Sequence, residues 1–145
     1  MDRQDRSLKA LTVLLRSSQS VQEVIKKDMI KYGVNPTEFA VLELLYHKGE
    51  QQIQHLGKKI LLASSSITYV VDKLEKKGYV ERKPSPTDRR VIHANITESG
   101  KAFMDNAFPK HKELIGQVFE ELSEEEIETA IVILKKLGLH AVEIK

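Results

Sequence analysis

Hydrophobic residues recur every three or four positions over the first thirty residues, and this spacing predicts one long amphipathic helix from about residue 7 to residue 32. At 1.5 Å per residue such a helix is about 39 Å long. Because a small domain has no core of that length, we expect part of the apolar face to pack against another subunit, although the helix could also lie along its own domain. The face consists of Leu8, Leu11, Leu15, Ser18, Val21, Ile25, Met29 and Tyr32.

Two shorter helices are predicted next. Gly33 ends the long helix. Asn35 then supplies an N-cap, Pro36 a proline at the first helical position, and Glu38 the partner of a capping box. This second helix stops at Gly49, and a short third helix follows. Their predicted buried positions are Phe39, Leu42, Leu45 and Tyr46 in the second helix and Ile53, Leu56, Ile60 and Leu61 in the third.

A fourth helix has two different faces. Positions spaced as i, i+3, i+4 and i+7 are apolar and predicted to point inward, whereas the outer face is polar. Residues 63–66 open the segment with side chains that favour helix caps, and Gly78 closes it. The inward residues are Ile67, Val70, Val71 and Leu74, and the outward residues are Ser65, Ser66, Thr68, Tyr69, Asp72, Lys73 and Lys76.

A β-hairpin with a basic tip is predicted directly after this helix. Residues 79–83 alternate apolar and polar side chains, and residues 91–96 place Ile92, Ala94 and Ile96 on one face. Residues 84–88 between them form a turn. Three short helices followed by such a hairpin describe a winged helix-turn-helix, a mainly α fold with a small β-hairpin wing.

Two further helices complete the chain. One starts at Thr97 and is expected to be bent or interrupted near Pro109. The other starts with a capping box of Ser123 and Glu126, and we expect it to end near Gly138, after Lys135 and Lys136. The apolar stripe of the first of these helices consists of Phe103, Ala107, His111, Leu114, Ile115, Val118 and Leu122. The predicted buried edge of the second helix consists of Ile127, Ile131, Leu134 and Leu137.

The net charge of the chain conceals an uneven distribution of charge along the sequence. The chain has 145 residues and a net charge of only +2. Residues 51–96, however, carry 9 basic and 4 acidic groups, against 8 and 7 in residues 1–50 and 6 and 10 in residues 97–145. The positive charge therefore lies in the segment with the hairpin, which favours a nucleic-acid partner.

Several classes are excluded by what the chain lacks. It has no cysteine, so it has no disulfide, thiolate zinc site, iron–sulfur cluster or redox-sensing thiol. No segment has the roughly 20 consecutive apolar residues that cross a bilayer, and the first ten residues alternate in charge sign. We therefore expect a cytoplasmic protein without membrane association.

The fourth helix is the candidate reader of base edges. A recognition helix presents short hydrogen-bonding side chains near its N-terminus, because that end enters the major groove. The three serines could also be nothing more than a redundant N-cap. The groove-facing candidates are Ser64, Ser65, Ser66, Thr68 and Tyr69, and the candidates for neutralising phosphates are Lys58, Lys59, Lys73, Lys76 and Arg82.

The hairpin tip carries Asp88, Arg89 and Arg90. We expect Asp88 to pair with Arg90 across one residue and to orient it, so that Arg90 or Arg89 enters a minor groove, where narrow A·T tracts concentrate negative potential. A solvated run of charges is the alternative. The hairpin and the polar helix face together favour the DNA-binding interpretation.

The chain resembles the MarR family of bacterial winged-helix transcription regulators over nearly its whole length. The match is densest in residues 66–68, 71–82 and 96–100 and at the tip residues Asp88 to Arg90. The resemblance implies one domain over 1–145, with a DNA-binding part at 33–96 and dimerisation helices at 1–32 and 97–145. It also implies a homodimer on a palindromic operator of double-stranded DNA, Asp88 and Arg90 as the wing-tip pair, and repression rather than activation.

The same resemblance implies a small aromatic or phenolic effector, bound in a crevice between the dimer helices and the winged part. Residues 38–49 and 108–111 look like the subgroup that governs responses to quinones and related aromatic compounds. The alternative for each crevice candidate is an ordinary core position. The candidates are Met29, Tyr32, Phe39, Leu42, Tyr46, His47, Phe103, Phe108 and His111.

Other functions are less well supported by the residues. No Gly-rich phosphate loop or nucleophile elbow is present, so we expect neither an enzyme nor a cofactor. The five histidines lack metal-ligand spacing, which leaves a metal-responsive regulator as an alternative only through a site assembled across helices. A winged-helix protein-interaction module is the other alternative, although its fourth helix would have an apolar outer face.

Overall fold

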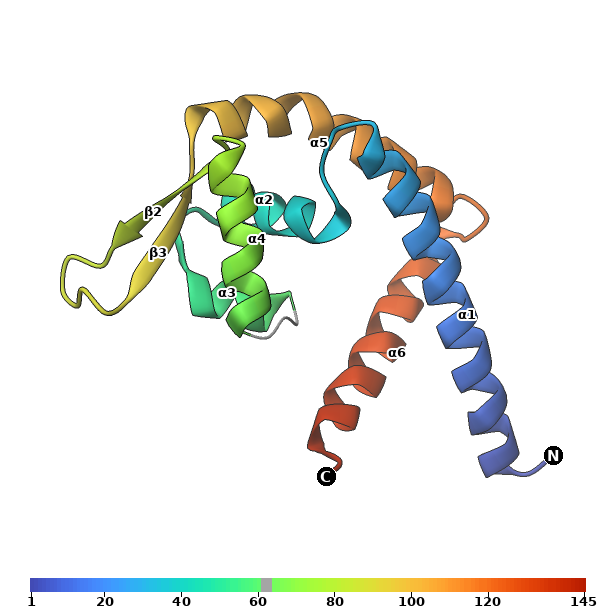
Figure 1. Ribbon diagram of the computed structural model, residues 1–145. Helices are drawn as coiled ribbons and strands as arrows, with labels where there is room; N and C mark the ends of the chain where they lie inside the picture. The colour runs from blue at the N-terminus through green and yellow to red at the C-terminus, as the bar shows by residue number, and fades with distance from the viewer. Residues whose placement is uncertain (61–63) are drawn as a thin grey trace. The chain divides into compact units, whose positions relative to one another are not determined.

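The computed structural model describes residues 1–60 and 64–145, and it describes no side chain at positions 64 and 65. The chain forms two compact units, Met1–Pro109 and Lys110–Lys145. The first unit contains α1 to α4, the three strands and the first half of α5, and the second contains the rest of α5 and α6 (Figure 1). Leu61, predicted for the third helix, lies outside the described residues.

The long first helix is confirmed as α1 (Arg3–Ile30). It begins earlier than predicted because Asp2 caps it in a box with Asp5, whose backbone N–H donates to the Asp2 carboxylate at 2.8 Å. Its C-terminal end is in the core, where Met29 is 1% exposed. Its N-terminal half is not covered within the chain, since Leu8, Leu11 and Leu15 are 64%, 49% and 59% exposed.

The helices of the winged part are α2 (Pro36–Lys48), α3 (Ile53–Lys59) and α4 (Ser64–Lys76). The predicted capping box of α2 is present: the Glu38 N–H donates to the Asn35 side chain at 2.7 Å, and the Asn35 N–H donates to Oε1 of Glu38 at 3.0 Å. Gly49 ends α2 with φ of 81°, a left-handed conformation that favours glycine. The core between these helices contains Phe39, Leu42, Leu45, Leu56, Ile67, Val71 and Leu74.

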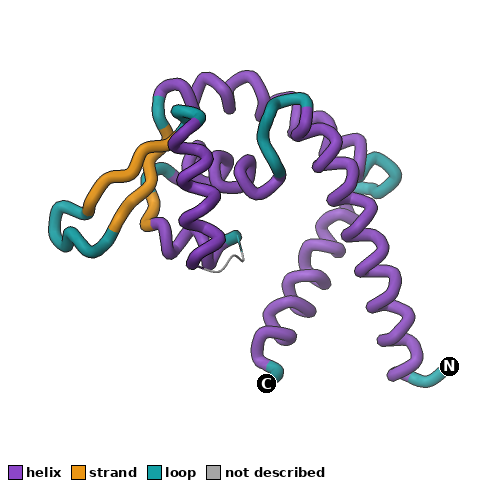
Figure 2. Tube along the Cα trace, in the orientation of Figure 1, coloured by secondary structure: helices purple, strands orange, loops and turns teal. Residues whose placement is uncertain are grey.

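The predicted hairpin is confirmed as β2 (Val80–Pro84) and β3 (Ile92–Ile96), which pair antiparallel from Val80 with Ile96 to Pro84 with Ile92 (Figure 2). Ala94 and Ile96 are buried, as their alternation predicts. A third strand that the pattern does not reveal, β1 (Gln51–Gln52), pairs with the other side of β3. Two glutamines carry no hydrophobic alternation, so no periodicity could have predicted this strand.

The end of α4 is tied to the start of α5 (Glu98–Val118). The Thr97 hydroxyl donates to the Gly78 carbonyl at 2.6 Å and accepts from the Gly100 N–H at 3.0 Å, so it caps α5 at the same time. The Thr97 N–H donates to the Tyr79 carbonyl at 2.9 Å. Because these bonds join the C-terminal end of α4 to α5, the two helices are held together at this point.

The C-terminal helices differ from the prediction in three respects. The helix α5 is not interrupted at Pro109 but continues through it, because the proline ring removes a single intrahelical bond and the turns on either side stay intact. The alternative, a bend at this position, stays a prediction. The helix α6 (Glu124–Glu143) begins with the predicted Ser123 capping box but continues past Gly138. Its expected buried edge is exposed within the chain, since Ile131, Leu134 and Leu137 are 42%, 50% and 52% exposed.

None of the helices in the described ranges is long and apolar enough to cross a membrane.

Candidate nucleic-acid interface

The two-faced pattern predicted for the fourth helix is confirmed in α4. Ile67, Val71 and Leu74 are fully buried, while Ser66 and Thr68 are exposed on the opposite side. The side chains of Ser64 and Ser65, also predicted to face the groove, lie outside the described residues. The apolar side fixes the helix on the core and leaves the polar side open, which is the arrangement a base-reading helix needs.

Tyr69 and Lys73 are one helical turn apart on the open side of α4. The Tyr69 side chain is 60% exposed, and the Lys73 ammonium lies 5.0 Å from the centroid of its ring. The attraction between a cation and the face of an aromatic ring favours this placement. It keeps the Lys73 charge next to the exposed face of the helix.

The predicted pair at the wing tip is present. The Asp88 carboxylate accepts from the Arg90 N–H at 3.0 Å, from Nε at 3.1 Å and from Nη2 at 3.1 Å. The Arg90 side chain nevertheless remains 91% exposed. The carboxylate therefore holds one edge of the guanidinium and leaves the rest of it open to solvent, beside the exposed Arg89.

The Asp88 titration provides a test of this pair. The side-chain and backbone bonds from Arg90 hold the pKa of Asp88 below its ordinary value of 3.8. Because the pKa is lowered, the pair stabilises the folded wing tip when the pH is above the ordinary pKa of the carboxyl group. This stabilisation is lost as the pH falls through the lowered, folded-state pKa. In a carboxyl-carbon NMR titration we expect Arg90→Ala to raise the Asp88 midpoint toward its ordinary value, because the side-chain bonds are lost while the backbone N–H of residue 90 still donates. Arg89→Ala removes the same charge outside the pair and is expected to leave the midpoint low; equal shifts in both variants would contradict the pairing.

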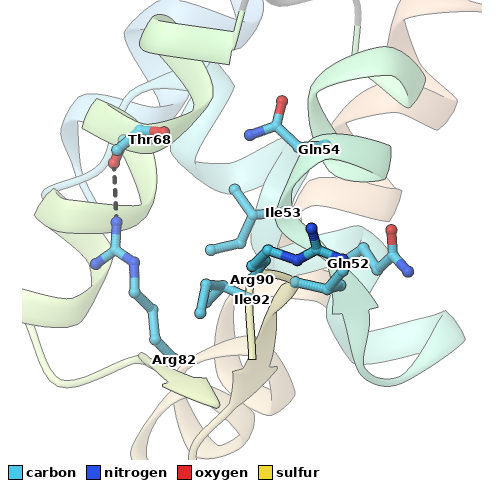
Figure 3. Close-up of a pocket in the computed structure, with 8 residues that line it drawn as sticks. Gln52, Ile53, Gln54, Thr68, Arg82, Arg90 and Ile92 are labelled. Atoms are coloured by element: carbon cyan, nitrogen blue, oxygen red, sulfur yellow. Dashed lines mark hydrogen bonds between the residues drawn. The ribbon is translucent and has the colours of Figure 1, made fainter. Parts of the chain in front are cut away.

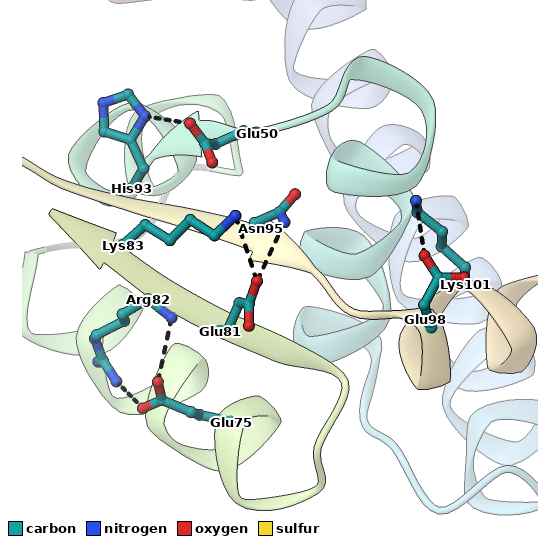
Figure 4. A network of polar contacts seen from close by, with 9 residues as sticks. All are labelled: Glu50, Glu75, Glu81, Arg82, Lys83, His93, Asn95, Glu98 and Lys101. Carbon is teal, nitrogen blue, oxygen red and sulfur yellow. Dashed lines mark hydrogen bonds and ion pairs between the residues drawn. The ribbon is translucent and has the colours of Figure 1, made fainter. Parts of the chain in front are cut away.

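Arg82 has a different environment from the one the sequence predicts. Its Nη2 lies 2.6 Å from Oδ1 of Asp72, and its side chain is 26% exposed. Its Nη1 lies 2.6 Å from Oε1 of Glu75 (Figure 4). Nη2 also donates to the Thr68 carbonyl at 3.3 Å. Arg82 therefore connects the base of the wing to α4, and two carboxylates neutralise its charge. Asp72 and Glu75 lie ten and seven residues before Arg82 in the sequence, and this separation does not predict an ion pair.

A cleft of about 280 Å³ lies between α3, α4 and the wing (Figure 3). Gln52 lines it from β1, Ile53 and Gln54 from the start of α3, Thr68 from α4, and Arg82 and Arg90 from the wing. The two glutamines carry no signal in the sequence, because neither lies in the recognition helix or at the wing tip. The cleft brings the polar side of α4 and the Arg90 guanidinium to a common surface.

The predicted effector residues fall into three groups. Met29, Phe39 and Leu42 are at most 2% exposed and form part of the hydrophobic core. One ring cluster joins Tyr32 to Phe103 at 6.5 Å and Phe103 to Tyr79 at 4.7 Å between centroids, and a second joins His47 to Tyr46 at 5.1 Å and to Phe108 at 4.6 Å. His111 is half-buried on α5 in the second unit. Tyr79 belongs to the first cluster although it is not among the predicted crevice residues.

Tyr46 has a polar partner on α5. Its hydroxyl donates to the Asp105 carboxylate, and this hydrogen bond raises the pKa of Tyr46, with smaller contributions from burial and from the negative charge. Tyr46 therefore stays a neutral phenol at physiological pH.

Histidines form no metal site among the residues that the structure describes: no three His, Cys, Asp or Glu side chains are grouped there as metal ligands. The wing histidine, His93, instead faces Glu50, with Nδ1 3.1 Å from Oε2 (Figure 4).

The helix pair α3 and α4, the polar outer side of α4 and the adjoining hairpin define a winged helix-turn-helix, a class of DNA-binding protein. Comparison with known proteins leads to the family. The MarR family model matches residues 34–92, and the HTH-type transcriptional regulator MhqR of Bacillus subtilis (strain 168) is 54% identical over 137 residues, 94% of this chain and 94% of that protein. The chain belongs to the MarR family of transcriptional regulators, and it is therefore a DNA-binding regulator and not an enzyme.

Two other known proteins agree with this assignment. The transcriptional repressor MprA of Escherichia coli (strain K12) is 33% identical over 130 residues, which cover 88% of this chain and 74% of that protein. The crystal structure of a mutant MarR from E. coli complexed with operator DNA superposes with a TM-score of 0.83 at 21% identity, covering 94% of this chain and 99% of that one. At this identity the second comparison shows the shared fold.

Proposed function

We propose that this protein is a cytoplasmic homodimeric repressor that binds a palindromic operator and is released from it by a small aromatic, phenolic or quinone-like effector. The observation that carries the proposal is the joint exposure of the polar side of α4 and of the Asp88–Arg90 pair next to it in one compact unit. A wing and a recognition helix presented together can contact adjacent grooves of one duplex.

In the proposed complex the residues have three kinds of role. The exposed positions of α4 read base edges in the major groove, and Arg90 enters the neighbouring minor groove. Asp88 and Arg82 act as positioning residues, because each holds or is held by charged neighbours. The base readers are Ser64, Ser65, Ser66, Thr68 and Tyr69, and the phosphate contacts come from Lys73, Lys76 and Arg89.

The operator can be tested by selecting bound fragments from the genomic DNA of the source organism and footprinting them. A two-fold dimer requires two half-sites spaced by about 10–10.5 base pairs or a multiple of that. A single unpaired half-site that is protected at saturation would contradict the palindrome. Binding through phosphates should weaken by about 0.9 log units of affinity per log unit of salt for each phosphate neutralised, and a protein-interaction module would show no such slope.

The homodimer rests on the uncovered apolar stripe of α1. Leu8, Leu11 and Leu15 lie on one side of that helix and are about half to two-thirds exposed in the single chain. We expect Leu11→Glu to convert the dimer to a monomer, because the charge would have to be buried in the subunit interface. Sedimentation equilibrium measures the change. The matched control is Ser20→Glu, about 180° around the same exposed helix; a dimer that survives Leu11→Glu would place the interface elsewhere.

The effector is proposed from the two ring clusters, which combine apolar surface with the neutral Tyr46 hydroxyl. An aromatic ligand would stack on such rings, and its own hydroxyl would donate to the Tyr46 phenol oxygen, whose proton is donated to Asp105. We expect phenol, hydroquinone or benzoquinone to lower operator affinity in a fluorescence-anisotropy titration, and an aliphatic diol of similar size serves as the control. Unchanged operator binding with all phenols and quinones would exclude this class of ligand.

A further inference from the structure

Lys77 is the residue directly after α4, and its side chain turns away from the proposed DNA contacts toward the end of α1. Its ammonium donates to the Gly33 carbonyl at 2.8 Å and to Oε2 of Glu38 at 2.8 Å. In the sequence it looks like one more basic residue of the fourth helix, next to Lys76. Its bonds instead link the recognition helix to the turn between α1 and α2.

The partner of Lys77 is unusual in this protein. Among the residues that the structure describes, Glu38 is the only buried charged one, with a side chain 3% exposed. Its other carboxylate oxygen, Oε1, accepts from the Asn35 N–H in the α2 capping box. A carboxylate so far from water is tolerated only when it is paired, and Lys77 is its ionic partner.

We propose that Lys77 is a positioning residue for operator recognition: through Glu38 and Gly33 it sets the orientation of α4 relative to the α1–α2 turn, without touching DNA itself. This inference rests on the proposed DNA contacts of α4. A small rotation at the Lys77 end of α4 displaces the other end considerably, because α4 has 13 residues and is therefore about 20 Å long. A tilt of about 5° at the Lys77 end would move the groove-facing end by about 1.7 Å, and hydrogen bonds to base edges do not survive such a shift.

The Lys77 contacts link α4 to the turn that follows α1. Gly33 and Glu38 lie on either side of the α2 cap, and the same turn follows Met29, the buried end of α1. The other half of α1 carries the exposed stripe that we assign to the dimer. Lys77 therefore connects the recognition helix to the helix that would hold the partner subunit, and its loss should impair base reading more than phosphate binding.

The test compares Lys77→Met with its neighbour, Lys76→Met, which removes the same charge from an exposed position. Affinities for the operator and for a random duplex are measured by fluorescence anisotropy between 50 and 200 mM salt, a range over which phosphate contacts produce a clear slope. For Lys77→Met we expect about a tenfold loss of operator affinity, with random-duplex affinity and salt slope unchanged. For Lys76→Met we expect equal losses on both duplexes and a slope shallower by about 0.9.

Two more variants separate positioning from folding. Lys77→Arg keeps the charge and the donors and should restore operator affinity to within about twofold. Glu38→Gln keeps the capping box but removes the ion pair, so Lys77→Met should cost less in that background than in the wild type. The double variant leaves no unpaired buried charge and allows the measurement even where Lys77→Met alone fails to fold.

Three outcomes would overturn the inference on Lys77 while leaving the proposed DNA contacts in place. Lys77→Met could behave as Lys76→Met does, which would make Lys77 a phosphate contact. It could lower the melting temperature and leave operator affinity unchanged, or its effect could be the same with Glu38 and with Gln at position 38. A wild-type protein that does not distinguish any duplex from random DNA would overturn the proposed DNA contacts, and the inference with them.

Discussion

Gly100→Ala is expected to destabilise the protein by about 3 kcal/mol, the upper part of the range for overpacking a tight contact. A Cβ at this position would overlap the backbone carbonyl oxygen of Tyr79 and lie 2.7 Å from Cγ1 of Ile96. The carbonyl cannot move aside, because it accepts from the Thr97 N–H at 2.9 Å. The first turn of α5 would have to withdraw from the end of α4, and the bonds between the two helices would be lost.

Thermal unfolding followed by circular dichroism measures this effect, with a melting temperature lower by roughly 6–12 °C at equal protein concentration. Gly116→Ala on the same helix is the matched control, because a Cβ there meets no atom within 4 Å. Replacing a helical glycine by alanine in open space should stabilise by up to about 1 kcal/mol. The two substitutions are thus expected to have opposite signs, and equal melting temperatures would contradict the close approach of α5 to Tyr79.

Local signals predicted much of the fold. The capping boxes at Asn35 and Ser123 and the inward stripe of α4 are read from residues within one or two turns of each other, so sequence spacing is sufficient to find them. The strand β1 has no such signal, since its two glutamines become a strand only through pairing with β3. The end of α6 was misplaced because Gly138 lies in open space, where nothing requires the helix to stop.

In the candidate site, too, contacts between residues close in the sequence were predictable, and contacts that depend on tertiary packing were not. The pair at the wing tip was predictable because Asp88 and Arg90 are two residues apart in a turn, within reach whatever the rest of the fold does. Arg82 and Lys77 were not, because Asp72 and Glu38 reach them only after α4 has packed on the core. Basic residues near a recognition helix therefore differ in role according to which acidic residues the tertiary fold brings next to them, and this information is not in the local sequence.

Arg90→Ala is expected to lower operator affinity by about 1–3 kcal/mol, or roughly 5- to 150-fold. Two hydrogen bonds to Asp88, from Nε and from Nη2, hold the guanidinium in one orientation while 91% of the side chain stays exposed. A cation that is oriented before binding loses little conformational entropy when it enters a groove. Because narrow A·T tracts attract arginine, the loss should be larger on the operator than on a random duplex.

Anisotropy titrations of the two duplexes at one salt concentration measure this difference. Lys101→Ala is the charge-matched control, since Lys101 lies on α5 and pairs with Glu98, outside the helix and wing that we assign to DNA (Figure 4). Asp88→Asn keeps the arginine but removes the carboxylate that orients it, so it should reproduce part of the loss. If Arg90→Ala binds the operator as tightly as Lys101→Ala does, Arg90 belongs to the solvated surface of the wing, and base recognition depends on α4 alone.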